Sequence, residues 1–594
     1  MVRGGPGDAR QRAASRSSRT APRSRRGMPT LPRWQDLVWP VAVFVPLVLA
    51  AVRLVLDGWW PSGDDALIAL RATDVWSAHP PLMGQRTTSL YTTAGIAVHH
   101  PGPLQYYVLG LTGGLTNFYP VGLLLGGVLV GAGTCAAAAV AARRHLGRVA
   151  MAMTVVGALA ITWRWGAAQL VRPYNLTATA LPLLALLVLT WVLLAGGRRW
   201  TPLWVFVASW CAQTHIGLLP LVVLLAALLV VLRARAWWAG ARRWLRDRAL
   251  GRRSARDRTA LWSTIVAVLV WLPVAIEPLL FRPSNVSELW RYVTQGSTAA
   301  RRGWGEAVQY LAVQAASPLA TPFVVSPDNG PRAAGFVLYG ALGACVVVAV
   351  VGLARRTTNP ASRAVLAGIP VALVATVVAA WSVARLEADR DLLYGSLFVP
   401  VPWFVFAVVV ATVTTQLSRL PRRWRVGLVL GALSVAGMAV CLVGAVQQAV
   451  GDRNTGANPQ VEAFSRTTAD AVAADATPGQ HVNIVAPGVQ GFVELSPAVA
   501  YRLEQRGHGT SMRIQWTIPQ DDDHRKNDNA PASSFGVLLR ERTDEGWSSP
   551  RPERGRPAAQ MDFAGGLGFP AARVVAWVGT EPLTDLGQHP TRTP

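Results

Sequence analysis

Apolar runs of membrane-spanning length recur along most of this chain, and they constrain its fold more than any other feature. An α-helix rises about 1.5 Å per residue, so roughly 20 apolar residues cross the hydrocarbon core of a bilayer. About eleven runs are found, at 39–56, 121–142, 149–164, 175–196, 201–216, 217–232, 260–280, 333–354, 363–383, 394–416 and 424–447. With 51% hydrophobic and 15% charged residues, the chain does not read as an ordinary soluble domain. The sequence therefore predicts a polytopic α-helical membrane protein.

The basic residues cluster at the ends of these runs. A net charge of +25 could indicate a nucleic-acid partner, but no basic face carries interleaved aromatic residues. The clusters lie instead in short connections at 143–148, 198–199, 233–258, 355–356 and 418–425. Basic loops stay on the cytoplasmic side, and all these clusters agree with one topology, in which the N-terminus is inside and the C-terminus outside. The charge therefore predicts a membrane orientation and argues against nucleic-acid binding.

This pattern divides the chain into three regions. Residues 1–33 are rich in Arg, Ser, Gly and Pro and predict a disordered, basic cytoplasmic tail. Residues 34–450 form the predicted transmembrane domain, with a first outer loop at 57–120. Residues 451–594 are less apolar and predict a small extracytoplasmic α/β domain. Its expected strands are 481–485, 512–516, 535–539 and 572–578, and its expected helices are 461–474 and 497–506.

The first outer loop concentrates the residues that could carry chemistry. Residues 58–107 contain three carboxylates, two adjacent histidines and a Pro-Gly-Pro, which make the stretch too polar for a span and too long for a simple turn. Asp64 and Asp65 open a helical segment, beside Trp59 and Trp60, which fit an interfacial aromatic belt. One acid could cap that helix, and the second would then need another explanation.

Carboxylates at a membrane surface suit glycosyl transfer from a lipid-linked donor. A base takes a proton from an acceptor hydroxyl as its oxygen attacks the anomeric carbon of the sugar, and the donor phosphate leaves. The charge that develops on the phosphate calls for arginine, histidine or a metal ion. The outer loops offer Arg71, His99, His100, Arg172, Arg282, Arg385 and Arg390 as candidates.

The first loop also resembles that of GT-C glycosyltransferases of the protein O-mannosyltransferase and aminoarabinose transferase type. Residues 63–65 (GDD) follow the first helix, and the loop closes in residues 100–107 (HPGPLQYY). The resemblance implies a GT-C fold, catalysis by Asp64 with Asp65 as its partner, and a polyprenyl-phosphate sugar as the donor. The chain departs from the family pattern in two places. Asp65 stands where better known members have Glu, and Gly102 replaces a Pro.

Further residues on the outer face are assigned to substrate binding. Together they are His100, Tyr106, Arg172, Tyr174, His215, Glu277 and Arg390. His215 and Glu277 are ionisable groups near membrane depth, where they are costly unless they are paired or functional. For His215, hydrogen bonds to neighbouring helix carbonyls are an equally good explanation. Relatives of this fold can bind a divalent metal, so His215 with Asp74 or Asp65 is a conceivable site, and metal dependence stays open.

Two other classes of protein would also contain many spans. A secondary transporter or lipid flippase commonly has repeated halves with broken helices, whereas this chain shows no internal repeat and gathers its polar residues on one face. A non-catalytic scaffold for envelope enzymes would leave the first-loop acids without a role. The leading hypothesis is therefore a hexosyl- or pentosyltransferase of the cell membrane, with an envelope glycan, a lipid or a protein as acceptor.

Overall fold

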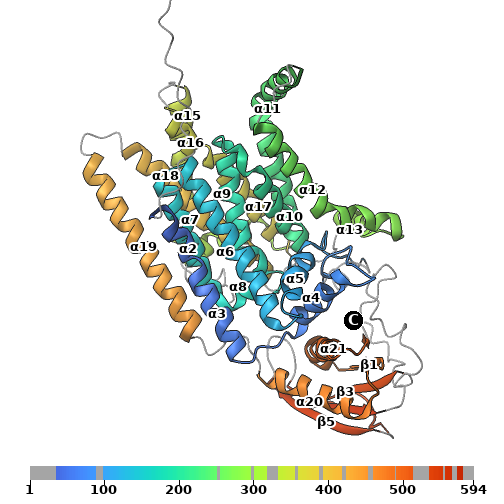
Figure 1. Ribbon diagram of the computed structural model, residues 1–594. Helices are drawn as coiled ribbons and strands as arrows, with labels where there is room; N and C mark the ends of the chain where they lie inside the picture. The colour runs from blue at the N-terminus through green and yellow to red at the C-terminus, as the bar shows by residue number, and fades with distance from the viewer. Residues whose placement is uncertain are drawn as a thin grey trace, which may run out of the picture.

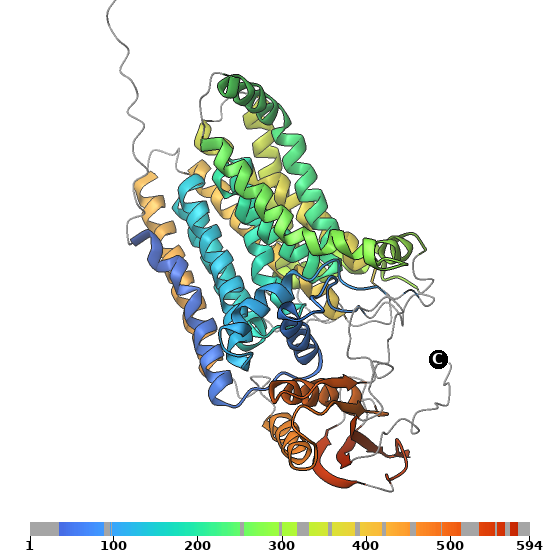
Figure 2. The same cartoon turned by 45° about the vertical axis from the view of Figure 1, so that its right-hand side comes forward.

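The chain folds into a bundle of long helices with a smaller sheet domain against one end, as Figure 1 shows for the computed structural model. The turned view in Figure 2 shows the same arrangement, with the sheet domain next to the short helices of the first loop. The structure describes residues 35–87, 96, 98–249, 255–295, 300–317, 332–354, 359–386, 392–417, 423–451, 459–488, 490–512, 534–552, 555–564 and 571–579. The predicted tail at 1–33 lies outside these residues.

The helices that form the predicted spans account for most of the bundle. They are α2 (Gln35–Ala42), α3 (Phe44–Leu56), α6 (Pro120–His145), α7 (Arg148–Trp165), α9 (Ala180–Leu194), α10 (Thr201–Thr214), α11 (Leu219–Ala249), α12 (Ala255–Leu280), α15 (Ala333–Ala354), α16 (Pro360–Leu366), α17 (Gly368–Ala384), α18 (Pro400–Leu417) and α19 (Arg423–Gly451). Within the described residues, nine helical stretches have the length and apolar composition needed to cross a membrane. The chain is therefore a multi-pass membrane protein.

Two of the eleven predicted spans fall short of that standard. The run at 201–216 forms α10, which has only 14 residues, and the run at 149–164 forms α7, which carries Arg148 and Arg164. Nearly all of α7 is buried among other helices, so its surface faces protein and need not be uniformly apolar. The total of eleven spans and their orientation remain predictions.

Helix α9 forms the centre of the bundle. All of its residues are buried, as expected for a helix that is apolar on every side. It packs against α6, α10, α17 and α18. Gly368 lets α17 approach, because a Cβ atom there would lie 2.8 Å from the ring of Trp191. The rest of the bundle is arranged around this helix.

The remaining helical elements lie in the connections between these helices. They are α4 (Gly63–Thr73), η1 (Asp74–Trp76), α5 (Leu104–Gly114), α8 (Ala167–Val171), η3 (Thr177–Thr179), η4 (Arg198–Trp200), η5 (Ile216–Leu218), α13 (Asn285–Gln295), α14 (Gly303–Ala316) and η6 (Leu392–Phe398). Hydrogen bonds join His100 to Asn175 and Ile216, and His99 to Asn285. The connections that contain candidate site residues therefore meet at one end of the bundle.

The C-terminal domain contains a mixed sheet with two helices. Its strands are β1 (Val482–Val485), β2 (Thr510–Met512), β3 (Phe535–Thr543), β4 (Gly546–Trp547), β5 (Arg556–Phe563) and β6 (Ala572–Gly579), and its helices are α20 (Pro459–Asp475) and α21 (Ser496–Gln505). The order is β2-β1-β3-β6-β5, with β4 on β3. Strand β1 is parallel to β2 and β3, whereas β6 is antiparallel to both its neighbours. Strand β5 is not in the sequence prediction, because it is largely exposed and begins Arg-Pro.

This domain and the first loop share one hydrophobic core. The indole N–H of Trp60 donates to the carbonyl of Ala498 at 3.1 Å, and the Trp60 ring lies 5.4 Å from that of Tyr501. The Arg502 guanidinium covers Trp60 at 3.4 Å from the ring centroid, and the Tyr501 hydroxyl donates to the Phe118 carbonyl. The expectation that Trp60 lies in an interfacial aromatic belt is therefore wrong, because the C-terminal domain covers this side chain.

Candidate active site

The two acids of the first loop lie in the first turn of α4. This helix begins at Gly63, whose φ of +52° is a conformation that glycine adopts without strain. Ser62 takes the N-cap position, and its side chain makes no capping bond. Asp64 and Asp65 follow within the turn, where the positive end of the helix dipole favours carboxylates. Neither acid is the N-cap, and both side chains bind groups outside the helix.

Asp65 is buried and paired with an arginine from another connection. Its Oδ2 atom accepts a hydrogen bond from Nε of Arg172 at 2.7 Å and forms an ion pair with Nη2 of the same guanidinium at 2.6 Å. Burial raises the pKa of Asp65, and the Arg172 guanidinium opposes this rise. The ion pair occupies Oδ2 of the buried Asp65, while 18% of the Arg172 side chain stays accessible to solvent.

Asp64 is the accessible acid of the two. Its Oδ1 accepts a hydrogen bond from Nε2 of Gln85 at 3.1 Å, and Oε1 of Gln85 accepts one from the Tyr106 hydroxyl at 3.2 Å. Because both ends of the amide are used, the orientation of Gln85 is fixed. Asp64 reaches solvent, yet protein crowds its carboxylate. This burial, followed by the negative charges of Asp65 and Glu494, raises the pKa of Asp64 to about 6.

A third carboxylate reaches the site from the C-terminal domain. Glu494 lies in η7 (Gly491–Leu495), which packs against α4. Its two oxygens lie 3.2 and 3.3 Å from the position that a Cβ atom would take at Gly63. Burial raises the pKa of Glu494. No motif marks this residue, since 430 positions separate it from Asp64 in the sequence.

His100 links three connections through both of its ring nitrogens. Nδ1 accepts a hydrogen bond from the backbone N–H of Ile216 at 3.1 Å, so the proton of the neutral ring sits on Nε2. The structure places Nδ2 of the Asn175 side-chain amide 2.8 Å from Nε2, and turning this amide over presents its oxygen as the acceptor that the tautomer needs. Burial, followed by the nearby His215 and His99, holds the pKa of His100 well below its usual value. His100 is therefore neutral and brings no positive charge to a phosphate.

His215 lies beside His100, with their ring centroids 4.8 Å apart. Its Nδ1 accepts a hydrogen bond from the backbone N–H of Gly217 at 3.1 Å, within the turn that joins α10 to α11. On another side, the ring of Tyr394 lies 6.3 Å away. These contacts give His215 a local role in the turn, and its part in substrate binding stays a prediction.

The conceivable metal site does not fit this geometry. Asp74 is paired with Nη1 of Arg71 at 2.6 Å, and Asp65 is paired with Arg172. A guanidinium beside each carboxylate repels a metal cation. Across the ranges that the structure describes, no group of three or more His, Cys, Asp or Glu side chains is arranged to hold a metal ion. Neither proposed partner of His215 is therefore suited to the role.

Glu277 supports the first loop through a neighbouring helix. Its Oε1 accepts a hydrogen bond from the backbone N–H of Asn285 at 2.7 Å, at the start of α13. Oδ1 of Asn285 in turn accepts one from the backbone N–H of His99 at 2.9 Å. Glu277 is buried and connects α12 to the loop, so its assignment to substrate binding stays a prediction. Arg390 lies outside the described residues.

Gly102 is required by close packing in the element that ends the loop. A Cβ atom there would collide with Oε1 of Gln213 and would lie 2.6 Å from Cγ2 of Val274. Gln213 is held in place by two hydrogen bonds, because its Oε1 accepts from the backbone N–H of Leu104 at 3.2 Å and its Nε2 donates to the carbonyl of Val270 at 2.8 Å. This packing leaves no room at position 102 for a side chain, including the ring of a proline.

The predicted site residues that the structure describes thus fall into two neighbouring groups and one outlier. One group contains Asp64, Asp65, Tyr106, Arg172 and Tyr174, the other contains His100 and His215, and Glu277 lies apart. Tyr174 belongs to the first group because the charges of Asp64, Asp65 and Arg172 all act on its hydroxyl. The first group can take up a proton and can present a guanidinium to an anion.

No protein-family model and no curated protein matches this chain. Among solved structures, it is similar to ArnT from Cupriavidus metallidurans bound to undecaprenyl phosphate, with 16% identity, a TM-score of 0.47, and coverage of 90% of this chain and 97% of ArnT. The oligosaccharyltransferase of Archaeoglobus fulgidus, in complex with Zn and sulfate, is 12% identical, with a TM-score of 0.36. That match covers 84% of this chain and 68% of the archaeal chain. The mycobacterial arabinofuranosyltransferase AftD is 15% identical, with a TM-score of 0.38, and the match covers 92% of this chain and 40% of AftD.

These three proteins are membrane glycosyltransferases of the GT-C superfamily, which the first loop of this chain also resembles. All three TM-scores lie below 0.5. The chemistry proposed for the site therefore depends on the geometry of this chain and on its first-loop motif.

Proposed function

We propose that this protein is a membrane glycosyltransferase that moves a sugar from a polyprenyl-phosphate donor to a hydroxyl group of an envelope acceptor. One observation supports this most directly. Asp64 is a solvent-accessible carboxylate with a pKa of about 6, fixed by Gln85 and set beside the Asp65–Arg172 pair. A base with such a pKa accepts a proton near neutral pH. The polyprenyl-phosphate donor follows from the resemblance of the first loop.

The reaction uses the two kinds of group that the site combines. Ionised Asp64 accepts the proton of the acceptor hydroxyl while the hydroxyl oxygen forms a bond to the anomeric carbon. The bond between that carbon and the phosphate oxygen breaks, and the polyprenyl phosphate leaves with the electron pair. Arg172, whose side chain is partly accessible, stabilises the charge on the leaving phosphate. Asp65 orients Arg172 by pairing with it.

The test uses full-length protein reconstituted in lipid vesicles with radiolabelled polyprenyl-phosphate hexoses and pentoses. The acceptor is an envelope extract from cells that lack the gene. Wild-type protein should transfer label, and the Asp64→Asn variant should lose at least 100-fold in rate, as roughly expected on removing a general base. The control is Asp57→Asn, which removes an exposed carboxylate at the end of α3 that pairs with Arg53 at 3.3 Å.

Full activity of the Asp64→Asn variant would exclude Asp64 as the base. If no label is transferred and the vesicles instead carry a solute or lipid across the bilayer, the transporter or flippase alternative is correct. A loss of activity as large in Asp57→Asn as in Asp64→Asn would indicate a general effect of charge at this surface.

We further propose that the site and the C-terminal domain face the outside of the cell. The support is the distribution of arginine clusters at the other end of the bundle, including Arg198 and Arg199. Thr467→Cys places an exposed thiol on α20, and Arg199→Cys places one at the opposite end. The native cysteines are all buried. A membrane-impermeant maleimide should label Thr467→Cys in intact cells and Arg199→Cys only after permeabilisation, and the reverse result would invert the topology.

A further inference from the structure

A cavity of about 130 Å³ lies between α9, α10 and α11, far from the site just described. Its position follows from α10, which begins at Thr201 beside the cavity and ends at the turn that holds His215. A helix of that length separates its two ends by roughly 20 Å. The cavity therefore lies at the end of the bundle that carries the arginine clusters, and it is unrelated to Asp64.

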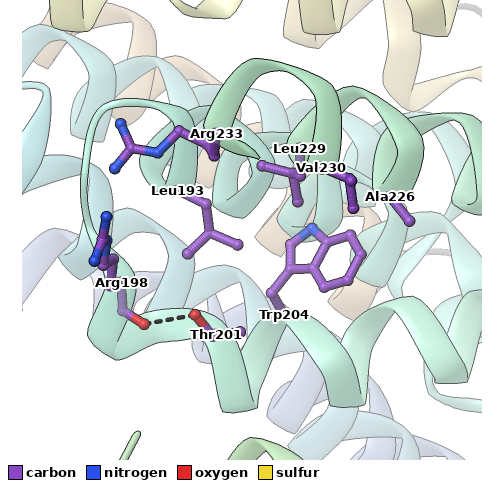
Figure 3. Close-up of a pocket in the computed structure, with 8 residues that line it drawn as sticks. All are labelled: Leu193, Arg198, Thr201, Trp204, Ala226, Leu229, Val230 and Arg233. Carbon is purple, nitrogen blue, oxygen red and sulfur yellow. Dashed lines mark hydrogen bonds between the residues drawn. The ribbon is translucent and has the colours of Figure 1, made fainter. Parts of the chain in front are cut away.

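One side of this cavity is apolar. Leu193 of α9 faces Leu229 and Val230 of α11, and the ring of Trp204 from α10 completes the wall (Figure 3). The indole N–H of Trp204 donates to the hydroxyl of Thr190 at 2.8 Å, so its polar group is already satisfied inside the bundle. Hydrocarbon can pack against such a wall, whereas a small polar solute finds few partners there.

The other side is positively charged. Figure 3 shows the guanidinium groups of Arg198 and Arg233 on the same side of the cavity, away from Trp204. Nη1 of Arg233 donates to the carbonyl of Leu194 at 3.3 Å, which holds this side chain over the end of α9. The apolar stretch of α11 ends at Ala234, directly after Arg233, and Arg198 lines the same cavity, so we place both arginines where the bilayer meets water.

We propose that this cavity binds an anionic phospholipid, with the headgroup phosphate between Arg198 and Arg233 and part of an acyl chain against the apolar wall. A guanidinium matches the geometry and charge of a phosphate group. A free phosphate would leave the apolar wall uncovered, and a zwitterionic lipid would gain less from two arginines. This inference concerns a different end of the molecule and does not depend on the proposed sugar transfer.

Native mass spectrometry of the full-length protein tests the proposal. Delipidated protein is titrated with dioleoyl phosphatidylglycerol and, separately, with dioleoyl phosphatidylcholine, which has the same chains. About one favourable charge contact per arginine predicts a preference for phosphatidylglycerol of roughly 30-fold. Glycerol 1-phosphate serves as a headgroup without chains and should not compete at equal concentration. No preference for the anionic lipid, or full competition by glycerol 1-phosphate, overturns the proposal.

Three variants separate the two halves of the site. Arg198→Gln with Arg233→Gln should remove the preference, and the double lysine variant at the same positions should keep most of it. Ala226→Trp fills the apolar part and should weaken phosphatidylglycerol binding at least tenfold while both arginines remain. Arg199→Gln is the matched control, because Arg199 lies over Trp200 at 5.6 Å and does not line the cavity. Equal loss in Arg199→Gln, or unchanged binding in Ala226→Trp, contradicts the assigned site.

Discussion

The pKa of Asp64 should move in opposite directions when its two neighbours Glu494 and Gln85 are changed. Glu494→Gln removes a negative charge and keeps the shape of the side chain. Its carboxylate contacts Gly63, one residue from Asp64, so the two carboxylates are roughly 7 Å apart. At that distance and an intermediate dielectric constant the repulsion is about 1 kcal/mol, or about 0.7 pKa units. The pKa of Asp64 should fall from about 6 by this amount.

Gln85→Leu should have the reverse effect. The Gln85 amide donates to the ionised form of Asp64 at 3.1 Å, and a hydrogen bond to a charged group contributes about 1.5 kcal/mol. Its loss should raise the pKa of Asp64 by about one unit. For a base that acts in its ionised form, activity is lost as pH falls through the pKa. The quantity to compare is kcat/KM at pH 5.5 divided by the plateau kcat/KM of the same protein. This fraction should be about 2.5-fold larger for Glu494→Gln than for the wild type, and several-fold smaller for Gln85→Leu.

The assay is a pH profile of kcat/KM for sugar transfer between pH 4.5 and 8.5. The control is Asp57→Asn, whose profile should have the same midpoint as that of the wild type. Dividing each profile by its plateau value removes differences between variants in the amount of folded protein. If both variants scale the whole profile without moving its midpoint, Asp64 is not the titrating base. If both move the midpoint in the same direction, the assigned contacts are wrong.

Three further predictions concern stability, measured as thermal unfolding of purified protein in detergent. Arg172→Met should cost about 3–5 kcal/mol because it leaves Asp65 buried and unpaired, and adding Asp65→Asn should recover much of the loss. The pKa of Asp64 is raised in the folded protein, so its ionisation destabilises the fold as pH rises toward about 6. The Asp64→Asn variant should therefore be more stable than the wild type at pH 8, and the difference in stability should shrink toward pH 4. Gly102→Ala should cost about 1–3 kcal/mol, whereas Gly133→Ala, with open space around it, should be neutral or stabilising.

The sequence predicts the bundle well because apolar runs and arginine clusters are local signals. It also places Asp64, Asp65 and Arg172 on one face, and the structure joins them. It could not show that Asp65 is the acid engaged by Arg172, since the choice between two adjacent acids depends on which way each side chain turns. For the same reason, the sequence left His100 as a possible cation, whereas its hydrogen bond from Ile216 requires a neutral ring.

Other features depend on contacts between segments far apart in the chain. Trp60 next to a membrane span is typical of an aromatic belt, and only the docked position of α21 shows that it belongs to a protein core. Glu494 is one acid among many in the C-terminal domain until η7 is seen against α4. Strand β5 has no alternating apolar pattern, because much of it stays exposed beside β6.

The core shared by the first loop and the C-terminal domain sets an order of events during synthesis. The turn with Asp64 leaves the ribosome early, but Trp60 and Gly63 receive their final neighbours only when Ala498 and Glu494 have also been made and have reached the same side of the membrane. A partly made chain would therefore expose this apolar surface and would lack a complete site. The proposed active site is complete only after the C-terminal domain has been made and has docked against the first loop.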